Sequence, residues 1–322
     1  WRPEALIGPG FQMSFAATTA LVAVFGAIRD SSHDLPRQRL LRGVASVVLS
    51  SAVAGAATAP FAMAHFNQIA QFGLIANLLT VPLMGLLVIP AAVLGILLMP
   101  FGLEALGLVP MGLGLEWILH IAKSLARWDG AVRPVMTPGS AVLPLIALGG
   151  LFIVLWQGRV RLLGLVPLCF AVWLWINAER PAILVAEGGA LVGVMTDRGR
   201  ALSRPKGSGF IAKVWLENDG QGLDQAAAST LWEGQTWPIQ HIHGKRNAAA
   251  FQGCAEGELI IASADLPDRA LSEDCVVYDA SALKGQGSLS ITRTQSGIWQ
   301  IQKARDRSGA RLWNDASVRQ GQ

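Results

Sequence analysis

The 38 residues from Phe66 to Leu103 contain no Asp, Glu, Lys or Arg. A bilayer core of about 30 Å is crossed by about 20 apolar helical residues. The run is therefore of membrane type, but it is too long for one straight crossing. Asn77, Pro82 and two further prolines interrupt it. We predict one crossing plus a broken or re-entrant half-helix over 69–103.

Other apolar runs of nearly membrane length flank this segment. The chain is 52% hydrophobic and only 15% charged, whereas soluble domains are about 25% charged. Residues 43–63 are rich in Gly, Ala and Ser, which favours close contact between helices. We predict an α-helical polytopic membrane region over residues 1–177, with about five to six helices. Besides 69–103, these are 11–28, 43–63, 105–122, 139–156 and 162–177.

Residues 178–322 have a different character and predict a small β-rich (α+β) soluble domain. Sixteen basic and sixteen acidic residues fall here. Residues 183–203 are typical of three strands joined by a Gly-Gly turn and an Asp-Arg-Gly turn. Short helices are expected near 221–228 and 266–274. Further strands are expected at 211–216, 258–263, 275–279, 287–294 and 297–303.

Basic residues in short loops predict the orientation of the membrane region. Arginines gather in the 29–42 loop and again in the 157–161 loop. Such loops face the cytoplasm by the positive-inside rule, so the last helix leaves the tail in the periplasm. The segment 123–133 then lies outside if 66–103 crosses once. The chain begins with Trp1 and shows no signal peptide, so we interpret it as a fragment.

Several polar residues within or beside the apolar runs are candidates for function. Gln12 and Ser14 either line a polar path or bond a neighbouring helix, because an unsatisfied polar group is costly in a bilayer. Asn77 with Pro82 either opens the helix towards a cavity or only kinks it. Arginines 127 and 133 either contact phosphates or form a charged interfacial face.

The cysteines and histidines of the tail are weak evidence for a catalytic site. Cys254 and Cys275 would meet an oxidising environment in the periplasm and could form a disulfide. The alternative is two separate thiols. The pair His241 and His243 alternates on a predicted strand and supplies two ligands, whereas catalytic zinc needs at least three. We expect no metal, no cofactor and no complete catalytic motif.

Two blocks of the membrane region resemble the ComEC family of DNA-uptake proteins. GPGFQMSFAATTALV at 8–22 is similar to the opening of that family's competence region. ATAPFAMAHFNQIAQFGLIANLLTVPLMGLLVIP at 57–90 is similar to its run of proline, an aromatic–polar segment and Asn-Leu-Leu-x-Val-Pro. The charged segment near 123–133 also fits. The tail looks like the ending of alphaproteobacterial members, with a WL-x-x-DG segment that ends at Asp219 and Gly220.

The resemblance implies a bacterial inner-membrane channel component for uptake of single-stranded DNA in natural transformation. Implied partners are the DNA strand, the lipid bilayer, a cytoplasmic motor and a periplasmic DNA receptor, with a homo-oligomer as a further possibility. It also implies an oligosaccharide-binding-like domain upstream. Many members end in a metallo-β-lactamase-like domain, whose HxHxDH motif this tail lacks. The alternatives are a membrane-anchored hydrolase or nuclease with a degenerate tail, and a non-conducting scaffold.

Overall fold

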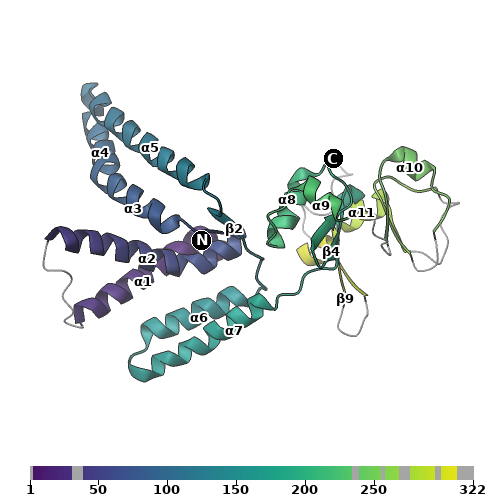
Figure 1. Cartoon of the computed structure of the whole chain (residues 1–322), viewed down its shortest axis with the longest axis horizontal. Helices are drawn as coiled ribbons and strands as arrows, with labels where there is room; N and C mark the ends of the chain where they lie inside the picture. Colours follow the sequence, from purple (N-terminus) through teal and green to yellow (C-terminus); the bar gives the residue numbers. More distant parts are fainter. Residues whose placement is uncertain are drawn as a thin grey trace. The chain divides into compact units, whose positions relative to one another are not determined.

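The computed structural model divides the chain into two compact units, Trp1–Ala178 and Glu179–Gln322 (Figure 1). We call them the membrane unit and the tail, and each is described by itself. The described residues are 3–30, 39–233, 239–254, 258–267, 276–293 and 299–309.

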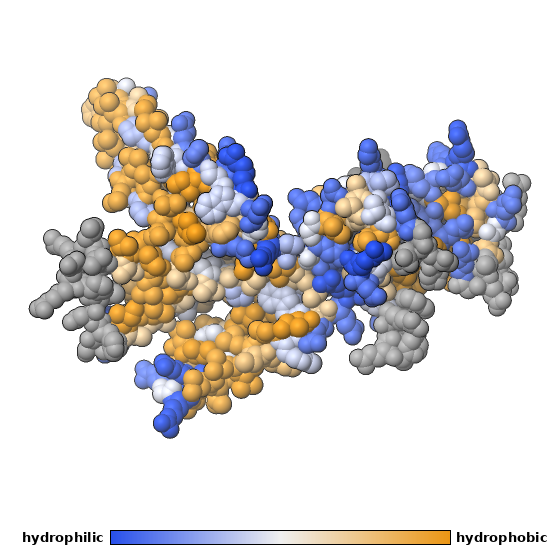
Figure 2. All heavy atoms as spheres, in the orientation of Figure 1, coloured by the Kyte–Doolittle hydropathy of each residue, from blue (hydrophilic) through white to orange (hydrophobic). Residues whose placement is uncertain are grey.

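The membrane unit is built from apolar helices, as its composition predicts. Five helical segments in the described part of the chain are long and apolar enough to cross a bilayer, and a sixth, Val142–Leu155, is shorter. Apolar side chains cover their surfaces (Figure 2). The helices are α1 (Pro9–Asp30), α2 (Arg39–Phe66), α3 (Gly73–Leu83), α4 (Ile89–Leu98), α5 (Ala105–Ala126), α6 (Val142–Leu155) and α7 (Leu165–Ile176).

The uncharged run forms one continuous helical segment, Gly73–Phe101, in contrast to the expected broken or re-entrant half-helix. Helix α3 continues through Pro82 into a π-helical turn, Met84–Val88, and then into α4. Because proline removes one N–H from the ladder, a local change of hydrogen-bond register restores the pairing of its neighbours. Gly102, with φ of 68°, ends the segment in the left-handed conformation that glycine adopts without strain.

The helices pack as three hairpins, α1 with α2, α4 with α5, and α6 with α7. The closest approach occurs at glycines of the second and third hairpins. A Cβ on Gly107 would lie 2.2 Å from the backbone nitrogen of Gly95, and one on Gly149 would lie 2.7 Å from the carbonyl oxygen of Gly164. A Cβ on Gly55 of the small-residue helix α2 would meet nothing within 4 Å. The closest backbone approaches at glycines therefore lie outside residues 43–63, the segment whose small residues favour close contact between helices.

A side chain at Gly107 should disrupt the second hairpin. We expect Gly107→Leu to lower the amount of protein in the membrane, because overpacking typically costs about 1–3 kcal/mol and here the obstacle is backbone. Gly112→Leu, on the same helix, is the control, since a Cβ there meets nothing within 4 Å. Immunoblots of membrane fractions compare the two. Equal abundance of both variants would contradict the close approach of α4 and α5.

A two-stranded ladder joins the ends of the hairpins. Strand β1 (Gln68–Ala70) follows α2, and it pairs antiparallel with β2 (Val132–Pro134), which follows α5. The Asn67 side chain donates to the carbonyl oxygen of Val135 at 3.3 Å, and the Trp175 indole donates to that of Met136 at 2.8 Å. We call residues 67–71 with 128–137 the junction. It ties the ends of α2, α5 and α7 to the starts of α3 and α6.

The junction fixes the alternation of crossings. Helix α2 ends at it, 73–101 leaves it, α5 returns, α6 leaves and α7 returns to it. The turns at Gly102 and Gly158 therefore lie at the opposite ends of the hairpins. The segment 73–101 runs once from the junction to the turn at Gly102, and 123–133 lies at the end from which the chain continues into the tail.

The tail contains two sheets. An antiparallel sheet has the strand order β10-β9-β3-β4-β5, and a parallel sheet has the order β6-β7-β8. The predicted turns of 183–203 are confirmed. The strands are β3 (Ile183–Val185), β4 (Val192–Thr196), β5 (Gly199–Leu202), β6 (Ile239–Ile242), β7 (Leu259–Ala262), β8 (Val276–Tyr278), β9 (Leu289–Arg293) and β10 (Trp299–Lys303).

The tail packs in two apolar layers. Ile183, Ile291 and Ile261 belong to a core that contains side chains of both sheets. The other face of the antiparallel sheet is covered near β5 by α8 (Gly209–Asn218) and α9 (Gln225–Thr230). The predicted strand 211–216 is therefore wrong. Ala212 and Leu216 are four residues apart and both buried, which is a helical spacing. The predicted helix 266–274 falls mostly outside the described residues.

Helices α10 (Lys245–Ala249), α11 (Ala280–Gln286) and α12 (Ala304–Ser308) complete the described part of the tail. Asp279 begins α11, and its side chain accepts a hydrogen bond from the backbone N–H of Ala282 at 2.9 Å. This is an ordinary N-cap, which satisfies one of the free N–H groups at the helix start.

The Asp219 of the WL-x-x-DG segment is half of a buried ion pair. Arg200 on β5 is fully buried, and its guanidinium binds both carboxylate oxygens of Asp219. The same guanidinium donates to the carbonyl oxygens of Gly193 at 3.3 Å and Pro181 at 3.2 Å. A buried charge is tolerated when it is paired and hydrogen-bonded. The segment therefore closes α8 onto the sheet.

Loss of the Asp219 carboxylate should destabilise the tail strongly. Removing one partner of a buried pair costs about 3–5 kcal/mol, because the other charge stays buried and unpaired. We expect Asp219→Ala to make the tail protease-sensitive at lower temperature, measured on the whole chain in detergent. Glu217→Ala is the control. Glu217 forms an exposed pair with Lys213 at 3.7 Å, worth about 0–1 kcal/mol. Similar losses in both variants would contradict the role of the buried pair.

Candidate functional site

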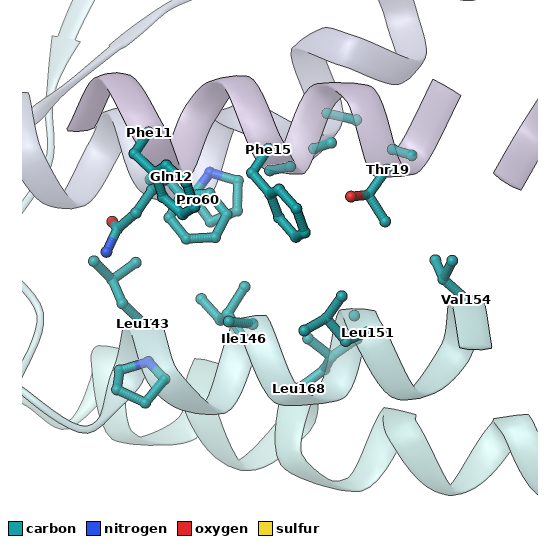
Figure 3. A pocket seen from close by; sticks show the side chains of 18 of the residues that line it. Phe11, Gln12, Phe15, Thr19, Pro60, Leu143, Ile146, Leu151, Val154 and Leu168 are labelled. Atoms are coloured by element: carbon teal, nitrogen blue, oxygen red, sulfur yellow. The ribbon is translucent and has the colours of Figure 1, made fainter. Parts of the chain in front are cut away.

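A cavity of about 450 Å³ lies between the first and third hairpins (Figure 3). Helices α1 and α2 form one wall, and α6 with Leu168 of α7 forms the other. The α6 wall is aliphatic and includes Leu143, Ile146 and Leu151. The cavity exists because these two hairpins contact each other far less than the helices within each hairpin do.

One face of α1 supplies the aromatic and polar lining. Phe11, Phe15 and Thr19 follow one another at intervals of four and line the cavity with Gln12. This spacing places them on one side of the helix. The rings of Phe11 and Phe15 are stacked, with centroids 5.7 Å apart and planes inclined by 9°. The helix therefore presents two parallel rings beside an amide and a hydroxyl.

Gln12 joins the cavity to the second helix. Its Oε1 accepts a hydrogen bond from Nε2 of His65, near the end of α2, at 2.8 Å. The two interpretations of Gln12 are compatible, since the residue lines the cavity and also bonds a neighbouring helix. The bond pairs the amide oxygen, and a hydrogen-bonded polar atom is less costly within a bilayer than an unpaired one. The hydrogen bond also holds the amide at the cavity edge.

The other path candidates do not share this cavity. Ser14 is exposed on another side of α1, where its carbonyl oxygen accepts from the Thr18 hydroxyl at 2.9 Å. Asn77 is exposed on α3, and Pro82 is half-buried on the same helix. None of the three lines the cavity. The structure therefore brings Gln12 together with Thr19 and not with Asn77.

The two candidate arginines lie at the junction end of α5. The Arg127 side chain is exposed and donates to the carbonyl oxygen of Lys123 at 3.2 Å. Arg133 is exposed on β2, and its Nε lies 2.8 Å from the amide oxygen of Gln71 once that amide is oriented to satisfy both of its neighbours. Trp128 packs edge-on against Phe72 at 5.1 Å and belongs to the same end.

The tail histidines are engaged by protein atoms. Nε2 of His241 lies 2.9 Å from the carbonyl oxygen of Gly189, and Nδ1 of His243 lies 3.0 Å from the hydroxyl of Ser263. Burial lowers the pKa of both imidazoles, and for His241 the hydrogen bond to the Gly189 carbonyl acts in the opposite direction. The described residues contain no cluster of three or more His, Cys, Asp or Glu side chains that could hold a metal ion. Cys275 lies outside the described residues, so its disulfide with Cys254 stays a prediction.

Sequence reasoning identified Gln12 but missed its companions. Phe15 and Thr19 look like ordinary residues of an apolar helix, and only their spacing of four and eight residues from Phe11 marks a common face. The aliphatic wall of α6 carries no such signal, because its lining and lipid-facing residues are equally apolar. No pattern within 139–156 predicts which helix faces α1.

The helices and their alternation define a multi-pass membrane protein. Residues 1–160 match the family model described as Competence protein. The chain therefore belongs, through its membrane unit, to the competence protein family, as the resemblance to ComEC proteins implies. The family is linked to DNA uptake in transformation. No curated protein and no solved structure matches the chain.

Proposed function

We propose that the membrane unit forms part of a path for single-stranded DNA across the bacterial inner membrane. The observation that carries this proposal is the cavity beside α1, where two stacked rings, one amide and one hydroxyl face a space between hairpins. The choice of DNA as the substrate comes from the family's link to DNA uptake. The conducting role of this chain and the residues that line the path are our own additions.

The chemistry of the lining suits a strand of any sequence. Aromatic faces stack on every base, because each base has a π-face, and this stacking is tolerant of sequence. The amide of Gln12 and the hydroxyl of Thr19 offer hydrogen bonds to whatever water or base edge lies beside the rings. A phosphate backbone still needs a hydrated wall. The cavity in one chain is largely apolar, so further elements, for example those of a second copy, would complete the path.

Two arginine side chains and two partner proteins complete the proposed mechanism. Arg127 and Arg133 are exposed at the junction and would contact phosphates at the mouth of the path. The printed sequence contains no G-x-x-x-x-G-K-[ST] phosphate-binding loop, so we assign the driving force to a cytoplasmic motor. A periplasmic receptor would deliver the strand. Asn77 and Pro82 stay candidates for a part of the path along the second hairpin.

The cavity lining can be tested by changing one face of α1 at a time. We expect Gln12→Leu and Thr19→Leu each to lower transformation frequency by about an order of magnitude, a loss of about 1.4 kcal/mol of path stabilisation. Ser14→Leu is the matched control, since it makes a similar change on a different side of the same helix. Membrane abundance, measured by immunoblot, should stay near normal in all three.

Two outcomes would contradict the proposal. Normal transformation by Gln12→Leu and Thr19→Leu at normal abundance would exclude this face from the path. Abundance that falls first, with uptake only following it, would assign Gln12 a purely structural role through its bond to His65. Asn77→Leu, scored in the same way, tests whether the second hairpin takes part.

The proposed orientation places the junction and the tail in the periplasm. It follows from the arginine-rich 29–42 and 157–161 loops and from the alternation of crossings. We expect single cysteines at Asp129 and Lys213, both exposed, to react with a membrane-impermeant thiol reagent in spheroplasts, and a cysteine at Arg159 to react only after lysis. A background with Cys169, Cys254 and Cys275 replaced is the control. Labelling of Asp129 and Arg159 positions from the same side would contradict the alternation.

A further inference from the structure

The antiparallel sheet of the tail has one face that helices cover only in part. Leu289 and Ile291 of β9 point into the core that both sheets share, so the intervening Ser290 points to the other face. Helices α8 and α9 pack on that face near β5. A groove of about 180 Å³ remains over β3, β9 and β10.

The floor of this groove is a row of cross-strand neighbours. Leu184 on β3 pairs with Ser290 on β9, and Ser290 pairs with Gln302 on β10. All three line the groove. The registered row therefore offers one apolar, one hydroxyl and one amide side chain across three strands.

The walls of the groove carry an aromatic ring and two cations. Trp215 of α8 forms one side, and Lys303 and Arg307, at the end of β10 and on α12, form another. Among the described residues, no carboxylate pairs with Lys303 or Arg307. The neighbouring Arg305 binds Glu187 at 3.5 Å, which takes up the charge of that carboxylate. Asp306 is the acidic residue of α12, so α12 has a positive balance.

A small groove with one aromatic ring and two cationic side chains suits a segment of an extended polyanion with flat bases better than it suits a whole small molecule. Small-molecule pockets usually measure about 300–1,000 Å³, so this groove holds only part of a ligand. An aromatic side chain beside cations along a groove is the general arrangement that binds single-stranded nucleic acid. We propose that this groove binds single-stranded DNA, with Trp215 against a base and with Lys303 and Arg307 against phosphates. The inference depends on the proposed function only for the choice of DNA.

The test uses the whole chain in nanodiscs of neutral lipid and a fluorescent 20-nucleotide thymidine strand, with anisotropy as the readout. We expect the double variant Lys303→Glu, Arg307→Glu to bind about tenfold more weakly. The dependence of log K on log salt should become shallower by about 1.4, about 0.7 for each lost phosphate contact. Lys245→Glu, Arg246→Glu on α10 is the control, because both residues are exposed and the net charge changes equally.

Trp215 is tested by a pair of substitutions. Trp215→Phe keeps a ring and should retain most of the affinity, whereas Trp215→Leu keeps apolar bulk and should bind the strand about tenfold more weakly, because the stacked base loses its aromatic partner. Because Trp215 also packs beside Leu216 and Ala212, the charge-reversal pair keeps the proposal testable if Trp215→Leu fails to fold.

The proposal is overturned if both double variants weaken binding equally, if the wild-type chain binds no strand, or if Lys303→Glu, Arg307→Glu loses binding to anionic vesicles while its affinity for DNA is unchanged. These outcomes are distinguishable from failure of the membrane path. Equilibrium binding reports on the tail groove, whereas transformation by the Gln12 and Thr19 variants reports on the cavity.

Discussion

The hydrogen bonds of the junction are the constraint on which the membrane unit depends. A backbone group without a partner is costly in a bilayer, so spanning segments must be helices and their ends must be satisfied elsewhere. The ladder of β1 with β2 pairs the backbone of the two segments that follow α2 and α5. The Asn67 amide binds the segment that leads into α6, and the Trp175 indole at the end of α7 binds the same segment. The order of crossings follows from these contacts.

Backbones approach closely within the second and third hairpins, whereas the first hairpin packs loosely against the third. Glycines at 95, 107, 149 and 164 let backbones approach inside the second and third hairpins, where dispersion between small residues replaces the hydrophobic effect. Among the described glycines, none brings the first hairpin as close to the third, and a cavity beside Phe15 lies between them. A site between hairpins can change shape without breaking the hairpins themselves, which is suitable for a path that admits a long flexible strand.

In the tail, one buried ion pair lies at the end of the helix that borders the open half of a sheet face. The pair between Arg200 and Asp219 anchors the end of α8 at the β5 edge. Helices α8 and α9 pack beside β5, and Trp215 of α8 lines the groove over the strands β3, β9 and β10. Helix α8 contributes Leu216 to the core and Trp215 to the lining of the proposed groove. The WL-x-x-DG segment therefore takes part in both.

The sequence by itself determined the class of protein. Helical period and the lack of charge revealed the spans, and the turns of 183–203 revealed the first hairpins of the tail, because these signals are local. It could not place Gln12 relative to Asn77, because the two lie far apart in the chain. It did not show that 211–216 is a helix, because which of its residues are buried depends on packing against Leu202 and Ala228. The same types of apolar side chain face lipid and line the cavity, so the sequence does not distinguish the two environments. Tertiary structure alone decided which hairpins enclose the cavity and which half of the sheet was left uncovered, since both depend on contacts between segments distant in sequence.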